Sequence, residues 1–264
     1  MLLVDQIKIP LQKAFPELAV FCFSELQSTS GYLKRYAQSH LSPAFCLALS
    51  QTSGYGQQSR VWKSDCSSLT FSTLLHLATP LHQIDGFTQL IALKLIESLS
   101  EYSDQSFKIK WPNDIYVDHK KAGGILVECV AYSETDCWLV VGIGLNNGLK
   151  EWIQDALTER AVVPNSIELG EENKIKFLMD VINRQLVLAK GFEIGYFKRY
   201  LVNYNLVDYF NAGESVIVYD KATKKSGFYK GLTDNGELLV TLEGQLCQFR
   251  SGAISIRPME HNND

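Results

Sequence analysis

The segment from Lys108 to Glu128 constrains the fold more than any other part of the chain. It reads KIKWPNDIYVDHKKAGGILVE. Polar and apolar residues alternate before Pro112, which is typical of a strand, and Pro112 ends that strand because proline cannot donate to a ladder. A second short strand, a polar turn and a third apolar strand follow. The pattern predicts a hairpin that places an amide, a carboxylate and an ammonium group beside two glycines.

The two adjacent glycines, Gly123 and Gly124, permit two interpretations. Residues without side chains ahead of a buried strand indicate that a ligand approaches the backbone closely. The same residues are compatible with a simple β-bulge beside an ordinary polar turn. The local pattern leaves both interpretations open.

This stretch resembles the central motif of the biotin protein ligases, enzymes that adenylate biotin and attach it to a carrier lysine. The resemblance is carried by Trp-Pro-Asn-Asp at 111–114 and by the segment KAGGILVE at 121–128. It extends over essentially the whole chain, from about residue 20 to about residue 260. It implies an enzyme with biotin and ATP as substrates, Mg²⁺ as cofactor and apo biotin carboxyl carrier protein of acetyl-CoA carboxylase as partner.

Composition excludes several other classes of protein. The chain has 264 residues, 46% of them hydrophobic, which is enough for a sizeable core and excludes wholesale disorder. A net charge of -4 without a basic stripe argues against general nucleic-acid binding. No apolar run is long enough to cross a membrane and the N-terminus shows no secretory signal, so we expect a cytoplasmic protein without membrane contact. The six cysteines lack a C-x-x-C spacing and predict reduced, buried thiols rather than a zinc site.

The order of the predicted elements indicates an α+β fold. Strands are expected at 19–24, 43–50, 67–77 and 136–147, and helices at 28–38, 85–102, 151–161, 174–190 and 192–201. Together with the resemblance, they predict a mixed or antiparallel central sheet packed with helices, similar to class II aminoacyl-tRNA synthetases. This catalytic domain would span residues 1–210.

Composition changes near Gly213, where short strands and hairpin turns begin. Asn235-Gly236 and Glu243-Gly244 are typical two-residue turns between strands. The pattern predicts a small antiparallel barrel of SH3-like type over residues 211–264. It matches the C-terminal domain of the family in place and size.

The N-terminal region bears on DNA binding. Some members of the family carry an N-terminal helix-turn-helix and repress transcription, and such a module needs roughly 50 residues or more. Only 27 residues precede Ser28. We therefore expect a monofunctional enzyme without repressor activity and without operator DNA as a partner. Family members also form homodimers through the central sheet, which makes a homodimer a further expectation.

The resemblance assigns several segments to a biotin site. Ser28, Thr29 and Ser30 precede a predicted helix, where hydroxyl groups and a helix N-terminus can bind a ureido ring. Taken alone, these residues predict only a helix N-cap, and the third position is Asn in the family. Gly142 and Gly144 interrupt a buried strand and would form a bare wall. The other implied biotin contacts are Gln51, Tyr55, Gly56, Gln57, Lys121 and Gly124.

A loop rich in glycine and polar residues follows the second predicted strand and reads QTSGYGQQSRVW over residues 51–62. Such a loop can wrap a phosphate with its backbone N–H groups, or it can be a flexible surface loop. The family has GRGRxGRxW here, so Tyr55 and Gln57 replace arginines and Ser59 replaces a glycine. The loss of two guanidinium groups predicts either weaker retention of the adenylate or compensation by Arg60 and Lys121.

The chemistry implied by the resemblance joins a carboxylate to the α-phosphate of ATP. Two anions must approach each other, so the site has to supply positive charge. We assign this catalytic role to Lys121, and we assign Asp114 to hold Mg²⁺ directly or through water. Trp111 fits either an apolar wall of the site or the core. The implied ATP contacts are Gly54, Arg60, Trp62, Asn113, Lys121 and Asn146.

Two other functions fit part of the pattern. A lipoate ligase or octanoyl transferase shares the fold, but the motifs of those enzymes lack Lys-Trp-Pro-Asn-Asp. A non-catalytic sensor of biotin or nucleotide is compatible with the missing arginines. Biotin-dependent ATP–pyrophosphate exchange distinguishes the three.

Overall fold

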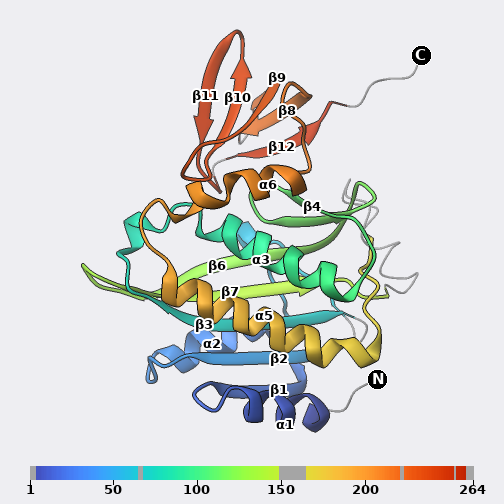
Figure 1. The fold of residues 1–264 in the computed structure, drawn as a ribbon, viewed down its shortest axis with the longest axis vertical. Coiled ribbons are helices and arrows are strands. Elements are labelled where there is room, and N and C mark those ends of the chain that lie inside the picture. Colours follow the sequence, from blue (N-terminus) through green and yellow to red (C-terminus); the bar gives the residue numbers. More distant parts are fainter. Residues whose placement is uncertain (1–3, 65–67, 149–164, 221–222, 253, 260–264) are drawn as a thin grey trace.

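The larger unit of the protein is a seven-stranded mixed sheet (Figure 1). A computed structural model describes residues 4–64, 68–148, 165–220, 223–252 and 254–259. The strand order is β1-β2-β3-β7-β6-β5-β4, in which β1 and β2 are parallel and every other neighbouring pair is antiparallel. The strands are β1 (Ala19–Leu26), β2 (Ala44–Gln51), β3 (Leu69–Leu77), β4 (Phe107–Lys110), β5 (Asp114–Val117), β6 (Lys120–Tyr132) and β7 (Cys137–Leu145).

Helices cover both faces of this sheet. Figure 1 shows α3 (Phe87–Tyr102) and α5 (Glu171–Gly191) in front of it and α2 (Thr29–Ala37) behind it. Helix α1 (Val4–Ala14) packs against the edge strand β1. Short 3₁₀-helices are η1 (Gln57–Ser59), η2 (Leu81–Gln83) and η3 (Tyr196–Tyr200). This arrangement confirms the predicted α+β class with a mixed central sheet.

The composition of the central strands follows from this double coverage. In β2, Phe45 and Leu47 belong to the large core under α3 and α5, whereas Ala44 and Cys46 belong to a smaller cluster under α2. Successive side chains of a strand point to opposite faces. A strand covered on both faces is therefore apolar throughout, which explains why β2 shows little alternation.

The central hairpin forms as predicted, with one difference. The third strand starts at Lys120, before the glycines, because Lys120 and Lys121 pair with Val117 and Tyr116 of β5. Gly123 and Gly124 continue the strand and pair with Leu145 and Gly144 of β7. The register also shifts between Ile115 and Tyr116, which marks a bulge or irregularity opposite this segment. The glycine pair thus lies inside the sheet beside an irregularity, so the bulge interpretation accounts for part of the pattern.

The C-terminal part forms a second, antiparallel sheet with the order β11-β10-β9-β8-β12. Its strands are β8 (Ser215–Asp220), β9 (Thr223–Leu232), β10 (Leu238–Leu242), β11 (Gln245–Phe249) and β12 (Ser255–Pro258). The predicted turns are present, with Gly236 and Gly244 at φ of 76° and 81°, a region that favours glycine. The strand order is linear, so closure into an SH3-like barrel stays a prediction.

The segment predicted as one helix over 192–201 instead contains η3, followed by α6 (Leu201–Val207). The helix predicted at 151–161 lies outside the described residues. Within the described part of the chain, no helix combines the length and the apolar character needed to cross a membrane.

Candidate active site

A strip of bare main chain crosses the α2 face of the central sheet. Gly124 of β6 pairs directly with Gly144 of β7, and directly opposed residues share a face, as do Gly142 and Gly144 two positions apart. A Cβ atom on Gly142 would lie 2.5 Å from Oγ of Ser30, and one on Gly144 would lie 2.6 Å from the indole ring of Trp62. Only glycine lets these neighbours approach the sheet so closely.

Hydroxyl and amide groups form a buried cluster near Gly142. Ser28 caps α2 as predicted. The hydroxyl oxygens of Thr29 and Ser30 lie 2.8 Å and 2.9 Å from Oγ of Ser72 in β3. Oε1 of Gln51 accepts a hydrogen bond of 2.8 Å from the backbone N–H of Thr29. The structure therefore brings four residues of the predicted biotin site together.

The hydrogen bonds determine which groups this cluster can offer to a ligand. The Thr29 hydroxyl donates to Oε1 of Gln51 at 3.3 Å, so Ser72 must donate to Thr29 and Ser30 must donate to Ser72. The remaining hydroxyl lone pairs are acceptors, while the NH₂ group of Gln51 is a donor. A cyclic urea, with two N–H donors beside one carbonyl acceptor, is complementary to that set.

Ser72 was not among the predicted site residues, although the sequence contains a signal for it. Thr70 and Ser72 are two hydroxyl residues at a spacing of two in β3, in which the only other polar residues are Thr73 and His76. They pair with Gly144 and Gly142, so they line the same face as the glycine strip. The signal is therefore two hydroxyl residues spaced two apart in one strand and two glycines spaced two apart in the strand beside it.

An ion pair lies farther along the strip. Nζ of Lys121 is 2.5 Å from Oδ1 of Asp114, and the two side chains are 28% and 26% exposed. Asp114 pairs with Gly124, and a Cβ atom on Gly124 would lie 3.7 Å from Nζ of Lys121. Strand spacing puts the ion pair on the order of 10 Å from the hydroxyl cluster. The strip therefore joins a urea-binding end to a cationic end across bare backbone.

Two asparagines hold the backbone around the ion pair. Nδ2 of Asn113 donates to the carbonyl of Ile125 at 2.5 Å, and Nδ2 of Asn146 donates to the carbonyl of Asn165 at 3.0 Å. Both side chains are buried. The amides thus fasten the ends of β5 and β7, and a direct contact with nucleotide stays a prediction for both.

The loop over residues 51–62 forms a narrow hairpin. The backbone N–H of Gly56 donates to the carbonyl of Arg60 at 2.8 Å, and that of Trp62 donates to the carbonyl of Gly54 at 2.9 Å. Tyr55 pairs with Val61 as an isolated bridge. These contacts give the loop a definite shape, which an unstructured surface loop would lack.

The tip of this hairpin is exposed and polar. Arg60 points to solvent and donates to Oε1 of Gln58 at 3.0 Å, so the structure does not bring its guanidinium to Lys121. Gln57 belongs to η1 and is half-buried. Ser59 has φ of 57°, a left-handed conformation that a glycine adopts at lower cost.

The two tryptophans have different environments. The ring of Trp62 lies over Gly144, and its Nε1–H is buried without a hydrogen-bond partner among the described residues. A buried donor without an acceptor costs stability, so an acceptor atom on a ligand over the strip would complete this site. Trp111 is a core residue, 2% exposed, whose Nε1–H donates to the carbonyl of Gly236 at 3.0 Å.

Lys110 is a further cation near the ion pair that sequence reasoning did not select. Its Nζ lies 3.2 Å from the hydroxyl of Tyr116 and 5.1 Å from the centre of that ring. Burial lowers the pKa of Lys110 to about 8; Asp114 opposes this shift, and the charges of Arg257 and Lys121 add to it. Arg257 belongs to β12, so the C-terminal sheet also places positive charge beside the site.

Residues 20–146 match the biotin/lipoate A/B protein ligase family. This range contains the whole strip, the hydroxyl cluster and the ion pair. These residues form a domain of that family. Two named relatives show how far the sequence similarity extends. The bifunctional ligase/repressor BirA of Escherichia coli is 26% identical over 238 residues, which cover 89% of this chain and 73% of that protein. The human biotin–protein ligase is 36% identical over 107 residues, or 38% of this chain and 15% of that protein.

Solved structures of biotin protein ligases share the fold. The Aquifex aeolicus biotin protein ligase, in complex with biotin and ATP, superposes with a TM-score of 0.68 and 25% identity, covering 91% of this chain and 99% of that one. The Helicobacter pylori enzyme gives a TM-score of 0.61 at 20% identity, covering 88% and 99%, which supports the fold.

Proposed function

We propose that this ligase-family protein activates biotin with ATP to biotinyl-5'-AMP and transfers biotin to a specific lysine of an apo biotin carboxyl carrier protein. The observation that carries the proposal is the glycine strip, with a cluster complementary to a cyclic urea near one end and Lys121 at the other. Biotin is elongated, with a ureido ring and a carboxylate at opposite ends. The human relative named biotin–protein ligase and the Aquifex aeolicus biotin protein ligase, solved with biotin and ATP, support the same activity.

The strip would hold biotin with its ring toward α2. The hydroxyls of Thr29 and Ser30 accept from the ureido N–H groups, and the NH₂ group of Gln51 donates to the ureido carbonyl. Gly142 and Gly144 leave room for the ligand to lie against main chain. These contacts orient the carboxylate toward Lys121, and orientation is itself a large part of the rate acceleration.

Lys121 supplies the positive charge for the first step. The carboxylate oxygen attacks the α-phosphorus, pyrophosphate leaves, and negative charge accumulates on the α-phosphate oxygens. An ammonium group already held in place by Asp114 can stabilise that charge without reorganisation. In the second step the amine of the carrier lysine attacks the mixed anhydride, and AMP leaves. Neither step requires a nucleophilic side chain of the ligase.

Mg²⁺ fits this site only as a partner of the triphosphate. Asp114 is the carboxylate beside Lys121, and the described residues contain no cluster of three or more His, Cys, Asp or Glu side chains suited to a metal. Mg²⁺ is commonly bound by one or two carboxylates, several waters and substrate phosphates. Asp114 would hold the ion, which neutralises phosphate charge.

We also propose that the catalytic domain ends near residue 210.

Replacement of Lys121 tests the proposal. Lys121→Ala should lower the rate of biotin-dependent ATP–pyrophosphate exchange at least ~100-fold, because a preorganised charge at the reacting centre is lost. The melting temperature should change little, since the side chain is partly exposed. Lys120→Ala, at the exposed neighbouring position of β6, is the matched control and should keep normal exchange.

The choice of acid separates the alternatives. Exchange that requires lipoate or octanoate in place of biotin would contradict the proposal and favour the lipoate-type enzymes. An absence of exchange with all three acids, in a protein that binds biotin, would favour a sensor. Transfer of labelled biotin to an apo carrier domain in the presence of ATP and Mg²⁺ completes the test.

A further inference from the structure

Three residues from distant parts of the chain meet where the 51–62 hairpin crosses the sheet. The Tyr55 hydroxyl donates to Oε2 of Glu128 at 3.0 Å. Nζ of Lys34, in α2, donates to Oε1 of the same carboxylate at 2.8 Å and lies 5.8 Å from the centre of the Tyr55 ring. One carboxylate of β6 is thus bonded to the hairpin through one oxygen and to α2 through the other.

The setting of this contact makes it more than a surface pair. The Glu128 side chain is 24% exposed, and the Tyr55 ring is half-buried. Burial and the neighbouring Glu128 raise the pKa of Tyr55, and the hydrogen bond to Glu128 raises the pKa of Lys34. The phenol therefore stays a donor and the lysine stays charged at neutral pH, so both hydrogen bonds to the carboxylate are kept.

The contact is placed so that it controls the whole hairpin. Tyr55 lies between Gly54 and Gly56, whose backbone groups bond to Trp62 and Arg60 on the returning strand of the hairpin. Trp62 in turn covers Gly144 of the strip. Glu128 lies four residues after Gly124 in β6, so its side chain points to the same face of the sheet. The Tyr55–Glu128 bond therefore ties the hairpin to the same strand that bounds the strip.

We propose that Glu128, oriented by Lys34, is a positioning residue that anchors the 51–62 hairpin over the glycine strip through the hydroxyl of Tyr55. The inference rests on the proposed function for its effect on biotin, but the anchor itself is a property of the protein alone. Two arginines of the family are replaced in this hairpin by Tyr55 and Gln57. A contact between protein groups thus does part of what charge-assisted contacts to a ligand would otherwise do.

Amide hydrogen exchange of the hairpin tests the anchor directly. In Tyr55→Phe, which removes only the hydroxyl, the amides of Gly56 and Trp62 should exchange roughly 10-fold faster, because a charge-assisted hydrogen bond that holds the closed form is lost. Glu128→Ala should match it, and Glu128→Gln, which keeps an acceptor without the charge, should have a smaller effect. Lys34→Met should weaken the anchor least.

The kinetic readout separates positioning from general stability. If the hairpin opens more often, the apparent affinity for biotin falls with the closed fraction, so the KM for biotin should rise more than kcat falls in Tyr55→Phe and Glu128→Gln. Tyr132→Phe, at the exposed end of the same strand, is the matched control and should alter neither exchange nor KM.

The outcomes distinguish the anchor from the proposed function. Unchanged exchange at Gly56 and Trp62 in both Tyr55→Phe and Glu128→Ala would overturn the anchor, whatever the activity. Faster exchange with no biotin-dependent activity in any form of the protein would keep the anchor and remove the proposed function. Faster exchange with kcat lowered and KM unchanged would overturn the role of Glu128 in positioning the hairpin for biotin, because the hairpin would then not control access of biotin.

Discussion

Lys110 shows how the environment of one residue changes its chemistry. It alternates with core residues in β4, as Lys108 does, yet the two lysines differ in surroundings. Lys108 reaches a backbone carbonyl at Leu206 with its Nζ at 3.0 Å. Lys110 instead lies against Tyr116, and burial lowers its pKa to about 8. An amine that titrates near neutral pH beside the ion pair is suited to sense or bind the triphosphate of ATP.

Replacement of Lys110 gives a prediction at this scale. The amine is charged below its pKa of about 8, so we expect it to attract ATP at pH 7 and to lose that attraction as the pH rises through this value. The KM for ATP should therefore increase between pH 7 and pH 9. Lys110→Met should raise the KM about 10-fold at pH 7 and remove that pH dependence. Lys108→Met should retain both the low KM and its dependence on pH. A pH profile identical in the Lys110 variant would contradict the assignment.

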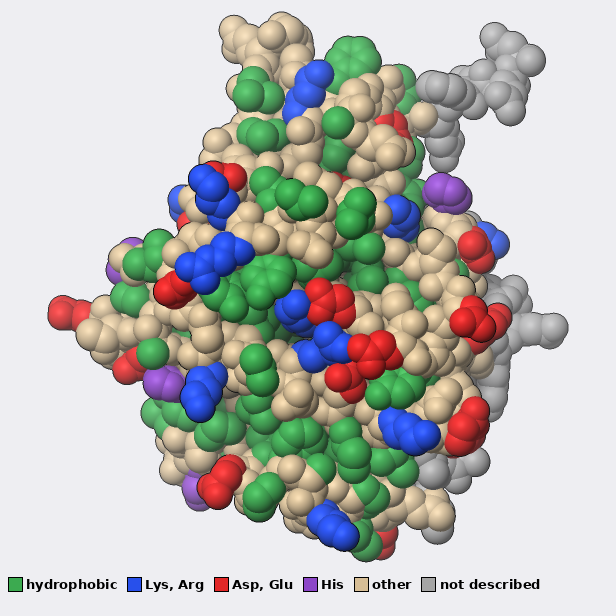
Figure 2. Space-filling view, in the orientation of Figure 1, with side chains coloured by type: hydrophobic (Ala, Val, Ile, Leu, Met, Phe, Trp, Pro, Cys, Tyr) green, Lys and Arg blue, Asp and Glu red, His purple; other side chains and the backbone are tan. Residues whose placement is uncertain are grey.

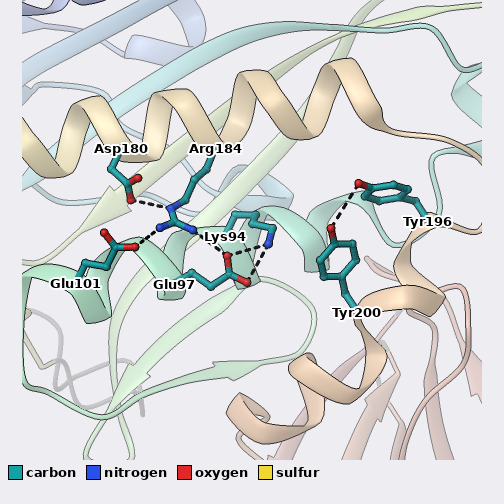
Figure 3. A network of polar contacts seen from close by, with 7 residues as sticks. All are labelled: Lys94, Glu97, Glu101, Asp180, Arg184, Tyr196 and Tyr200. Carbon is teal, nitrogen blue, oxygen red and sulfur yellow. Dashed lines mark hydrogen bonds and ion pairs between the residues drawn. The ribbon is translucent and has the colours of Figure 1, made fainter.

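At the scale of elements, a polar network joins the two helices that cover the front of the sheet. Figure 2 shows positive and negative side chains side by side in the middle of this face. Figure 3 shows Arg184 of α5 directed at Asp180 on its own helix and at Glu97 and Glu101 of α3. Nε lies 2.7 Å from Asp180 and Nη1 lies 3.0 Å from Glu97. All three nitrogens of the planar guanidinium thus form ion pairs, and Nη1 and Nη2 hold α5 against α3.

The network predicts a measurable contribution to stability. Arg184→Met keeps the aliphatic stem and removes the fork, which should lower the free energy of unfolding by about 1–2 kcal/mol, because the side chain is mostly shielded from solvent and serves three carboxylates. Arg199→Met, which removes an exposed pair with Glu193, should cost less than about 0.5 kcal/mol. Urea unfolding of both variants measures the difference. Equal losses would mean that the network adds nothing beyond a surface pair.

At the scale of the whole molecule, the two sheets are joined by buried hydrogen bonds. Asp208, at the end of α6, pairs with Ile109 of β4 and accepts from the hydroxyl of Tyr229 in β9. Trp111 donates across the same junction to Gly236. Burial raises the pKa of Asp208 from 3.8 to about 6, against the opposing effect of the Tyr229 hydrogen bond. The junction that carries the C-terminal sheet therefore contains a carboxyl group that titrates in the mildly acidic range.

The sign of the resulting pH dependence follows from the raised pKa. The folded protein binds the Asp208 proton more tightly than the unfolded chain, so this stabilisation is full below about pH 4 and is lost as the pH rises through about 6. Asp208→Asn cannot ionise, so its stability relative to the unaltered protein should improve between pH 4.5 and pH 7.5, by at most about 3 kcal/mol. Urea unfolding at both pH values measures it, with the exposed Asp220→Asn as control. A difference that does not change with pH would contradict the prediction.

Local sequence determined most of the helices and strands of this protein, whereas the assignment of the strip to biotin came from the family resemblance. An N-cap at Ser28 or Thr29 was recognisable, as were the three strands around Pro112 and the bare strand of Gly142 and Gly144, because each depends on backbone preferences of neighbouring residues. The assignment of Lys121 and Asp114 to one site needed only a hairpin, and they do form an ion pair. Short-range rules are sufficient for features of this kind.

Only the tertiary structure decided which distant residues share an environment. The contact of Ser72 with Thr29 and Ser30, the attachment of Tyr55 to Glu128 and the lowered pKa of Lys110 all depend on strand order and on the packing of a second sheet. Hydrogen-bond partners and burial are set by residues far away in the chain, and a single sequence contains no local record of those neighbours.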